Sequence, residues 1–315
     1  MDTVTKYLNK IAWKFPKGYP DLDNPIDRQI LAEEIGVQDL LEVTEDYDAR
    51  IKAVLKVEDI PKCQARLSVG EDFTLEGEDK ELWKELYPVL PLKKNSDVPT
   101  AGAGKGEIST YWAFQHNANP IEAQDARQSE DPDLIINDIG VELKSYETKG
   151  PITLGKFARD KNSIELLNQA FGVLSLFSDE AIQVNTGNFK STTLLQAFKV
   201  IEGLLDSEEL KSLGVAKPFY SKISTLYDKL GLDIGATAEQ ASAKLLRQML
   251  WTKLKKKPNL GKEEGYILNV TSDGRGKFYK ISEDSVNNIA DEDILNNGVY
   301  VASSEIQMNF NRLFK

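Results

Sequence analysis

The sequence contains very little of what disulfide frameworks and most transition-metal sites are made from. Its 315 residues include one cysteine, Cys63, and one histidine, His116. A single cysteine excludes an internal disulfide framework and any Cys-rich zinc site. A single histidine excludes every site that needs two imidazoles, so the HNH nucleases, the zincins and cupin-like metal centres are excluded as classes.

Long apolar segments are also missing. No stretch approaches the roughly 18 to 20 apolar residues of a membrane span, and the opening segment MDTVTKYLNK lacks the apolar region of a signal peptide. We therefore expect a chain that has no membrane partner. Its expected location is the reducing cytoplasm, or the host cytoplasm if the chain is encoded by a phage or another virus.

The composition is that of an ordinary globular protein, with 41% hydrophobic and 28% charged residues. The length suggests two domains, or one core that carries a large insertion. The net charge of −11 argues against a broad surface that coats nucleic acid. It leaves room for a local basic cleft, because binding depends on the field at the site.

The first 95 residues are more acidic per residue than the rest, with 14 Lys+Arg against 20 Asp+Glu. Apolar residues at helical spacing predict a mainly helical structure there. We interpret residues 1–95 as an accessory domain that binds a protein partner, and a structural extension of the main core is the open alternative. Residues 96–315 form the predicted second domain, with a helical insertion at about 178–258.

Periodicity and turn residues predict an α/β fold for this second domain. Helices are expected over 107–118, 162–176 and 304–314, with a continuously helical stretch from about 190 to 257. Strands are expected over 133–138 and 140–146, joined by a tight turn at Asp138–Gly140. Further strands are expected over 266–272 and 277–282, around a hairpin turn at Asp273–Gly276, and over 298–303.

The residues that could carry chemistry gather between positions 102 and 144. Asp133 and Glu142 are nine positions apart, so a tight hairpin would bring them side by side. Because strand side chains repeat with period two, Glu142 and Lys144 would share one face and Leu143 would enter the core. Glu107, at the start of the helix before them, would add a third carboxylate.

This set of residue types suits phosphodiester chemistry. Mg²⁺ prefers oxygen ligands and is usually held by one or two carboxylates together with water and substrate phosphate. A neighbouring lysine can position or help deprotonate the attacking water. The alternative is structural: a Glu-x-Lys pair on a solvated strand face that contributes well under ~1 kcal/mol, with Asp133 as a turn residue after Pro132.

The segment GKGEIS…DPDLIINDIGVELKSY resembles the active-site motif of the PD-(D/E)xK nuclease superfamily, whose fold is restriction-endonuclease-like. The resemblance implies a mixed sheet flanked by helices, with an α-β-β-β-α-β order of elements. It also implies that Asp133 and Glu142 bind the metal, that Glu107 completes the metal site, and that Lys144 is the catalytic lysine.

The expected function is therefore Mg²⁺-dependent hydrolysis of DNA phosphodiester bonds, with Mn²⁺ as a substitute and a 5′-phosphate left on the product. The resemblance favours an endonuclease. Two alternatives remain open: a metal-dependent exonuclease, which a homo-oligomeric ring would favour, and a nuclease-fold binding or assembly protein that lacks catalysis.

Basic residues mark two candidate DNA contacts. One group follows the motif directly, and the other surrounds the predicted end of the last long helix, where lysines would also suit the negative C-terminus of a helix. The residues in these groups are Lys149, Lys156, Arg159, Lys161, Lys253, Lys255, Lys256 and Lys257.

Overall fold

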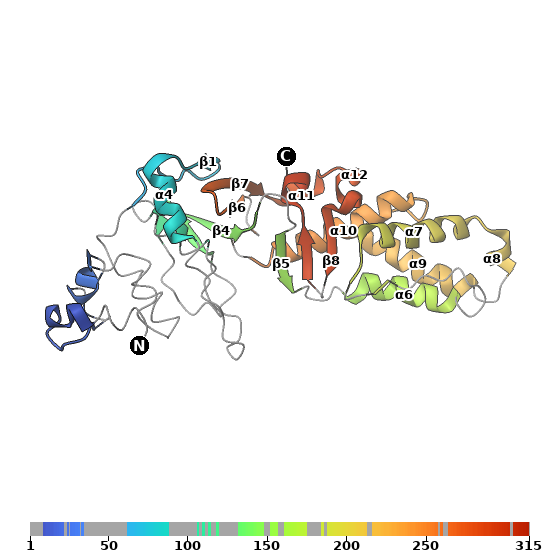
Figure 1. The fold of residues 1–315 in the computed structure, drawn as a ribbon. Coiled ribbons are helices and arrows are strands. Elements are labelled where there is room, and N and C mark those ends of the chain that lie inside the picture. Colours follow the sequence, from blue (N-terminus) through green and yellow to red (C-terminus); the bar gives the residue numbers. More distant parts are fainter. Residues whose placement is uncertain are drawn as a thin grey trace. The chain divides into compact units, whose positions relative to one another are not determined.

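The protein is described from a computed structural model and has a mixed α/β fold, which confirms the α/β part of the predicted fold class (Figure 1). Its chain contacts divide it into two units: residues 1–148 with 265–279, and residues 149–264 with 280–315. The structure describes residues 9–21, 24, 26–31, 33–34, 62–87, 106, 109–110, 113–114, 118–119, 132–147, 152–156, 161–174, 184–185, 188–212, 216–257, 259–260, 264–302 and 305–314.

The first unit is built on a mixed sheet whose described strands have the order β1-β7-β6-β4-β3-β2. The pairs β1–β7, β2–β3 and β3–β4 are antiparallel, whereas β4 and β6 run parallel from Val141↔Tyr266 to Ser145↔Val270. The strands are β1 (Phe73–Thr74), β2 (Ala118–Asn119), β3 (Leu134–Ile136), β4 (Ile139–Ser145), β6 (Gly265–Val270) and β7 (Arg275–Ile281).

The β3–β4 hairpin has a two-residue turn at Asn137 and Asp138. Both residues have positive φ, 48° and 66°, as a type I′ turn requires, and Asn and Asp are among the residues that tolerate this conformation best. The prediction of a turn at Asp138–Gly140 was wrong by one to two positions. Gly140 lies within β4, opposite Ile135, because the I′ turn needs no glycine here.

The β6–β7 hairpin confirms the predicted turn around Asp273–Gly276. The Thr271 N–H donates to the Arg275 carbonyl at 2.9 Å, and the Gly274 N–H donates back to the Thr271 carbonyl at 3.2 Å. Gly274 has a φ of +82°, a conformation that glycine adopts without steric cost.

One face of this sheet packs into the core of the first unit. The core contains Leu143 from β4 and Leu268 from β6, together with Trp83 from helix α4 (Gly77–Leu86). The buried Trp83 Nε1–H donates to the Thr271 carbonyl at 2.9 Å. Described residues of the first 87 and the strands after residue 133 thus share one core, so the contact-defined units do not follow the predicted boundary between 95 and 96. The assignment of separate domains to 1–95 and 96–315 stays a prediction.

The N-terminal part of the first unit also holds a 3-10 helix, η1 (Ala12–Lys14). Residues 26–31 and 33–34 are helical, and so are residues 106, 109–110 and 113, the last three of which belong to the helix predicted over 107–118. The predicted end of that helix was wrong, because Ala118 lies in β2 and pairs with Ile136. Gly106 lies against the sheet: a Cβ there would come within 2.6 Å of the Ser145 Cβ.

The second unit is mainly helical, and it confirms the helical character predicted for 162–176 and 190–257. Helix α6 packs against α9 and α7 packs against α10. Non-helical residues at 206–207 and 231–237 interrupt the stretch that the sequence pattern predicted to be continuously helical. In the part of the chain that the structure describes, no helix is long and apolar enough to cross a membrane. The helices are α6 (Lys161–Leu174), α7 (Ser191–Leu205), α8 (Glu208–Ser212), α9 (Ala216–Leu230), α10 (Ala238–Leu254), α11 (Glu283–Asn287), α12 (Asp291–Asp293) and the π-helix η2 (Ile294–Gly298).

A smaller sheet with the strand order β5-β9-β8 completes the second unit. Its strands are β5 (Ile152–Lys156), β8 (Val299–Ala302) and β9 (Glu305–Met308). The helix predicted over 304–314 was wrong in its first half, because Ile306 and Met308 alternate as buried residues and pair with β8. Among residues 305–314, which the structure describes, only α13 (Phe310–Leu313) is helical.

Candidate functional site

The β3–β4 hairpin brings three of the four predicted site residues together. Its register pairs Leu134 with Val141, which places Asp133 opposite Glu142 one step further along the two strands. Glu142 and Lys144 lie on the same face of β4, since the Lys144 ammonium donates to Glu142 Oε1 at 2.6 Å. The predicted juxtaposition of Asp133, Glu142 and Lys144 is therefore present in the structure.

Lys144 is the centre of the contacts in this group. Besides the bond to Glu142, its Nζ donates to the Leu143 carbonyl at 2.9 Å and lies 3.8 Å from Asp133 Oδ2. The same Asp133 oxygen accepts the Leu143 N–H at 2.7 Å. The ammonium thus lies between two carboxylates, and Asp133 is tied to the backbone of β4.

Burial separates this group from an ordinary surface ion pair. The side chain of Glu142 is 3% exposed, and those of Lys144 and Asp133 are each 19% exposed. The structural alternative of a solvated Glu-x-Lys pair is wrong for Glu142, because its strand face is covered. Burying these charges costs desolvation free energy.

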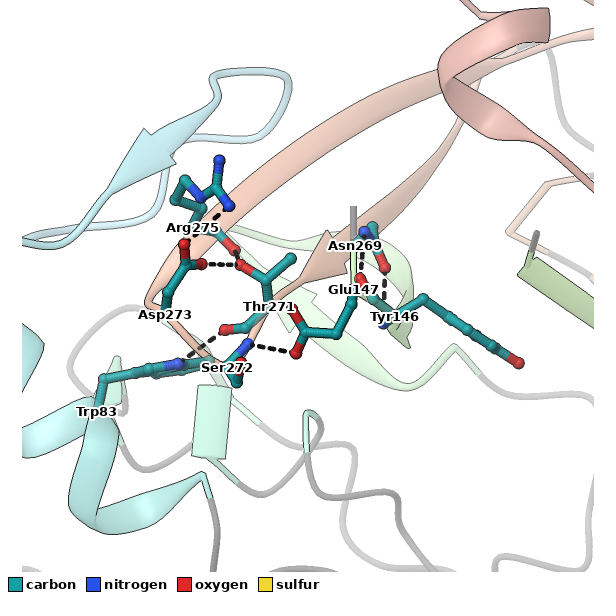
Figure 2. Close-up of polar contacts among 8 residues, drawn as sticks. All are labelled: Trp83, Tyr146, Glu147, Asn269, Thr271, Ser272, Asp273 and Arg275. Atoms are coloured by element: carbon teal, nitrogen blue, oxygen red, sulfur yellow. Dashed lines mark hydrogen bonds and ion pairs between the residues drawn. The ribbon is translucent and has the colours of Figure 1, made fainter. Parts of the chain in front are cut away.

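The C-terminal end of β4 is fastened to β6 by side chains (Figure 2). Asn269 of β6 accepts the Tyr146 N–H and donates to the Tyr146 carbonyl, both at 3.1 Å. The Ser272 N–H donates to Glu147 Oε1 at 3.3 Å. These bonds continue the parallel ladder beyond Ser145, and they fix the strand that carries Glu142 and Lys144.

Sequence reasoning missed Asn269. Its position gave one signal, a polar side chain in the middle of the apolar run YILNVT. Asn269 is 6% exposed, and buried polar side chains are nearly always hydrogen-bonded.

The β6–β7 turn beside this clamp has its own polar network (Figure 2). Arg275 lies 2.8 Å from Asp273 Oδ2, and Thr271 Oγ1 also bonds to Asp273. The Arg275 guanidinium, followed by the Thr271 hydroxyl, lowers the pKa of Asp273 below its ordinary value. The network stabilises the hairpin that presents Asn269.

Glu107, the fourth predicted site residue, lies outside the described residues. Within the described part of the chain, no group of three or more His, Cys, Asp or Glu side chains could hold a metal ion. The described candidates are the two carboxylates of Asp133 and Glu142. Two carboxylates match the number with which Mg²⁺ is commonly held when water and phosphate supply the other ligands, so the donor chemistry fits this ion.

The predicted DNA contacts are only partly described. Lys149 and Arg159 lie outside the described residues. Lys156 is in β5 opposite Glu305, and Lys161 is the first residue of α6. The other four predicted lysines lie around the C-terminus of α10: Lys253 is in its last turn, and Lys255, Lys256 and Lys257 follow it. Lys255 and Lys256 are exposed, and Lys253 and Lys257 are partly exposed.

Comparisons with known proteins add no assignment to this geometry. No protein-family model, no curated protein and no solved structure matches the chain.

Proposed function

We propose that this protein is a Mg²⁺-dependent deoxyribonuclease of the PD-(D/E)xK type whose site is the β3–β4 hairpin. The observation that carries the proposal is a lysine ammonium held between two largely buried carboxylates, at 2.6 Å from Glu142 and 3.8 Å from Asp133. A sheet gains little stability from such a group, whereas phosphodiester hydrolysis uses each of its members.

Asp133 and Glu142 are the residues that would hold the ion, Mg²⁺ or Mn²⁺, with Glu107 as the third carboxylate implied by the resemblance. The chemistry supplied at such a site is the lowering of the pKa of a water molecule and the stabilisation of charge on the phosphate. Lys144 positions the attacking water through its ammonium group. The Leu143 N–H bond to Asp133 and the Asn269 clamp hold these side chains in place.

The order of elements along the chain supports the proposed restriction-endonuclease-like core. The helical residues around 106–113 are followed by β2, β3, β4, α6 and β6, which is the α-β-β-β-α-β order that the resemblance implies. The strand β5 and the helices α7 to α10 are additions to this order, and α6 belongs to the second unit, so the support lies in the order of elements along the chain.

Cleavage of plasmid DNA tests the proposal. We expect the wild-type protein to nick or cut supercoiled plasmid with Mg²⁺ or Mn²⁺ and to leave it intact with EDTA. Asp133→Ala and Lys144→Ala should each lose this activity by at least about 100-fold while the fold survives. Lys199→Ala is the matched control, because Lys199 also pairs with a glutamate, at 3.2 Å, but on an exposed surface.

A linear plasmid in the same assay separates endonuclease from exonuclease. Internal cutting of the supercoiled form supports the endonuclease, and shortening of the linear form alone supports the exonuclease. Metal-dependent cleavage that is undiminished in Lys144→Ala would overturn the assignment of the site.

A further inference from the structure

A second lysine lies on the same face of the sheet as Lys144. In the parallel pairing of β4 with β6, Lys144 lies beside Asn269. The β6–β7 hairpin closes with the bond from Thr271 N–H to the Arg275 carbonyl, and this register, continued along the strands, places Lys277 opposite Asn269. Lys144, Asn269 and Lys277 therefore form a row across three adjacent strands.

Burial of the flanking residues supports this register. Leu268, Val270 and Phe278 belong to the hydrophobic core of the first unit, so their strand neighbours Asn269 and Lys277 lie on the opposite face. This is the face that carries Glu142 and Lys144, because Leu143 is also in that core.

The Lys277 ammonium contacts an aromatic ring and no carboxylate of the described residues. Its Nζ lies 5.1 Å from the ring centroid of Tyr279, which is 3% exposed. An ammonium over an aromatic face is attracted by the ring. Among the described residues, no carboxylate lies within ion-pair distance of Lys277, and its side chain is partly exposed.

The acidic residue beside Lys277 on the neighbouring strand, Asp72, accepts a backbone hydrogen bond. The pairing of Phe73 with Gly276 places Asp72 next to Lys277, and Asp72 Oδ1 accepts the Phe278 N–H at 2.8 Å. Lys277 is therefore a cation outside the ion pairs of the described residues, on the face that carries the carboxylates that would hold the metal.

We infer that Lys277 binds a phosphate of the substrate strand that flanks the phosphate positioned at Lys144. Two strand spacings separate the two lysines, about 10 Å at the backbone, and their long side chains can reach neighbouring phosphates of one nucleic-acid strand. Such a contact fixes the register of the nucleic acid without reading its sequence. The inference rests on the proposed function and adds a direction to it: the strand would cross the sheet from β4 towards β7.

The test measures binding of a fluorescein-labelled 20-base-pair DNA duplex by anisotropy between 50 and 200 mM KCl, with Ca²⁺ in place of Mg²⁺. Lys277→Met should weaken binding about 10-fold and reduce the slope of log affinity against log salt by about 1. Lys277→Arg should restore both. Lys280→Met is the matched control, since Lys280 is on the same strand but pairs with Glu264 at an exposed position.

Cleavage of bis(p-nitrophenyl) phosphate with Mn²⁺ provides the second readout. This small diester has no flanking phosphate, so Lys277→Met should cleave it at the wild-type rate, whereas Lys144→Ala should not cleave it. If Lys277→Met binds duplex DNA with wild-type affinity and salt slope, while the wild type binds and cleaves, this inference is wrong and the proposed function stands. If the wild type neither binds nor cleaves, both fail together.

Discussion

At the scale of single residues, the decisive feature is where the charges of the β3–β4 hairpin are buried. The period of two in a strand was enough to predict that Glu142 and Lys144 share a face and that Leu143 enters the core. The burial of Glu142, 2% exposed as a residue, could not be predicted from local sequence, since it depends on elements that cover the sheet. Asn269 was missed for the same reason, because its partner Tyr146 is 123 positions away.

Removal of one charge from the buried pair should destabilise the fold. Glu142→Gln removes the negative charge that lies 2.6 Å from the Lys144 ammonium, and we expect a loss of about 1–3 kcal/mol in the free energy of unfolding, because Lys144 keeps its contacts with Leu143 and Asp133 and some contact with solvent. Urea denaturation measures this. The double variant Glu142→Gln/Lys144→Met should recover part of the loss. The control is Glu239→Gln, since Glu239 forms an exposed pair with Lys199, and it should change the free energy of unfolding by less than about 0.5 kcal/mol. Equal effects of Glu142→Gln and Glu239→Gln would contradict this account of the pair.

The single cysteine should be chemically inert in the folded protein. Burial, followed by the charge of Asp79, raises the pKa of Cys63 from 9.0 to about 12. We expect alkylation by iodoacetamide at pH 8 to be at least ~100-fold slower than in urea, because the thiolate is the reactive form. Comparable labelling rates in the folded and unfolded states would contradict it.

The raised pKa of Cys63 also makes the free energy of unfolding fall at alkaline pH. The folded state holds the Cys63 proton more tightly than the unfolded chain, so this contribution is fully present below pH 9 and is lost as the pH rises towards 12. Cys63→Ala should remove this part of the alkaline decline, which urea denaturation at a series of pH values measures.

At the scale of elements, turns and short hairpins were predicted better than the ends of the chain. The β6–β7 hairpin was predicted from Gly274 and its polar neighbours, whereas the β3–β4 turn was displaced because Asn137 and Asp138 supply positive φ without glycine. The segment 304–314 was assigned to a helix because its apolar spacing fits both periods. Its pairing with β8 is a tertiary contact, and this contact decides in favour of the strand.

Two substitutions at one exposed position of the type I′ turn should change the stability of the protein in opposite directions. Asp138 has a φ of 66°, so Asp138→Gly should stabilise the protein by about 0.5 kcal/mol, and Asp138→Val should destabilise it by about 1–2 kcal/mol. Thermal or urea unfolding measures both. A β-branched residue that is tolerated at no cost would show that this turn has a different conformation in solution.

Trp83 ties helix α4 to the β6–β7 hairpin. Trp83→Phe removes the 2.9 Å bond to the buried Thr271 carbonyl and leaves a cavity, so we expect a loss of about 2–4 kcal/mol. Trp13→Phe is the matched control, because Trp13 is 79% exposed and should change stability by less than about 0.5 kcal/mol. Similar urea midpoints for the two variants would contradict the role of Trp83.

At the scale of the whole molecule, the net charge and the local charges at the proposed site act on DNA in opposite directions. The net charge of −11 repels DNA at long range, so the proposed activity depends on local cations such as Lys144 and Lys277 and should weaken steeply with salt. The α/β class was predictable from alternating strand and helix patterns. The division into two units was not, because it depends on which distant segments of the chain make contact.

The measurement that tests the central claim most directly is calorimetric titration of Mn²⁺ into the wild-type protein and into Asp133→Asn. It needs no knowledge of the DNA sequence that the protein cuts. The account predicts saturable binding to the wild type that is weakened at least about 10-fold in Asp133→Asn, with no change in Lys199→Ala. Absence of Mn²⁺ binding by the folded wild type, or equal binding by Asp133→Asn, would contradict the assignment of the β3–β4 hairpin as a metal-dependent nuclease site.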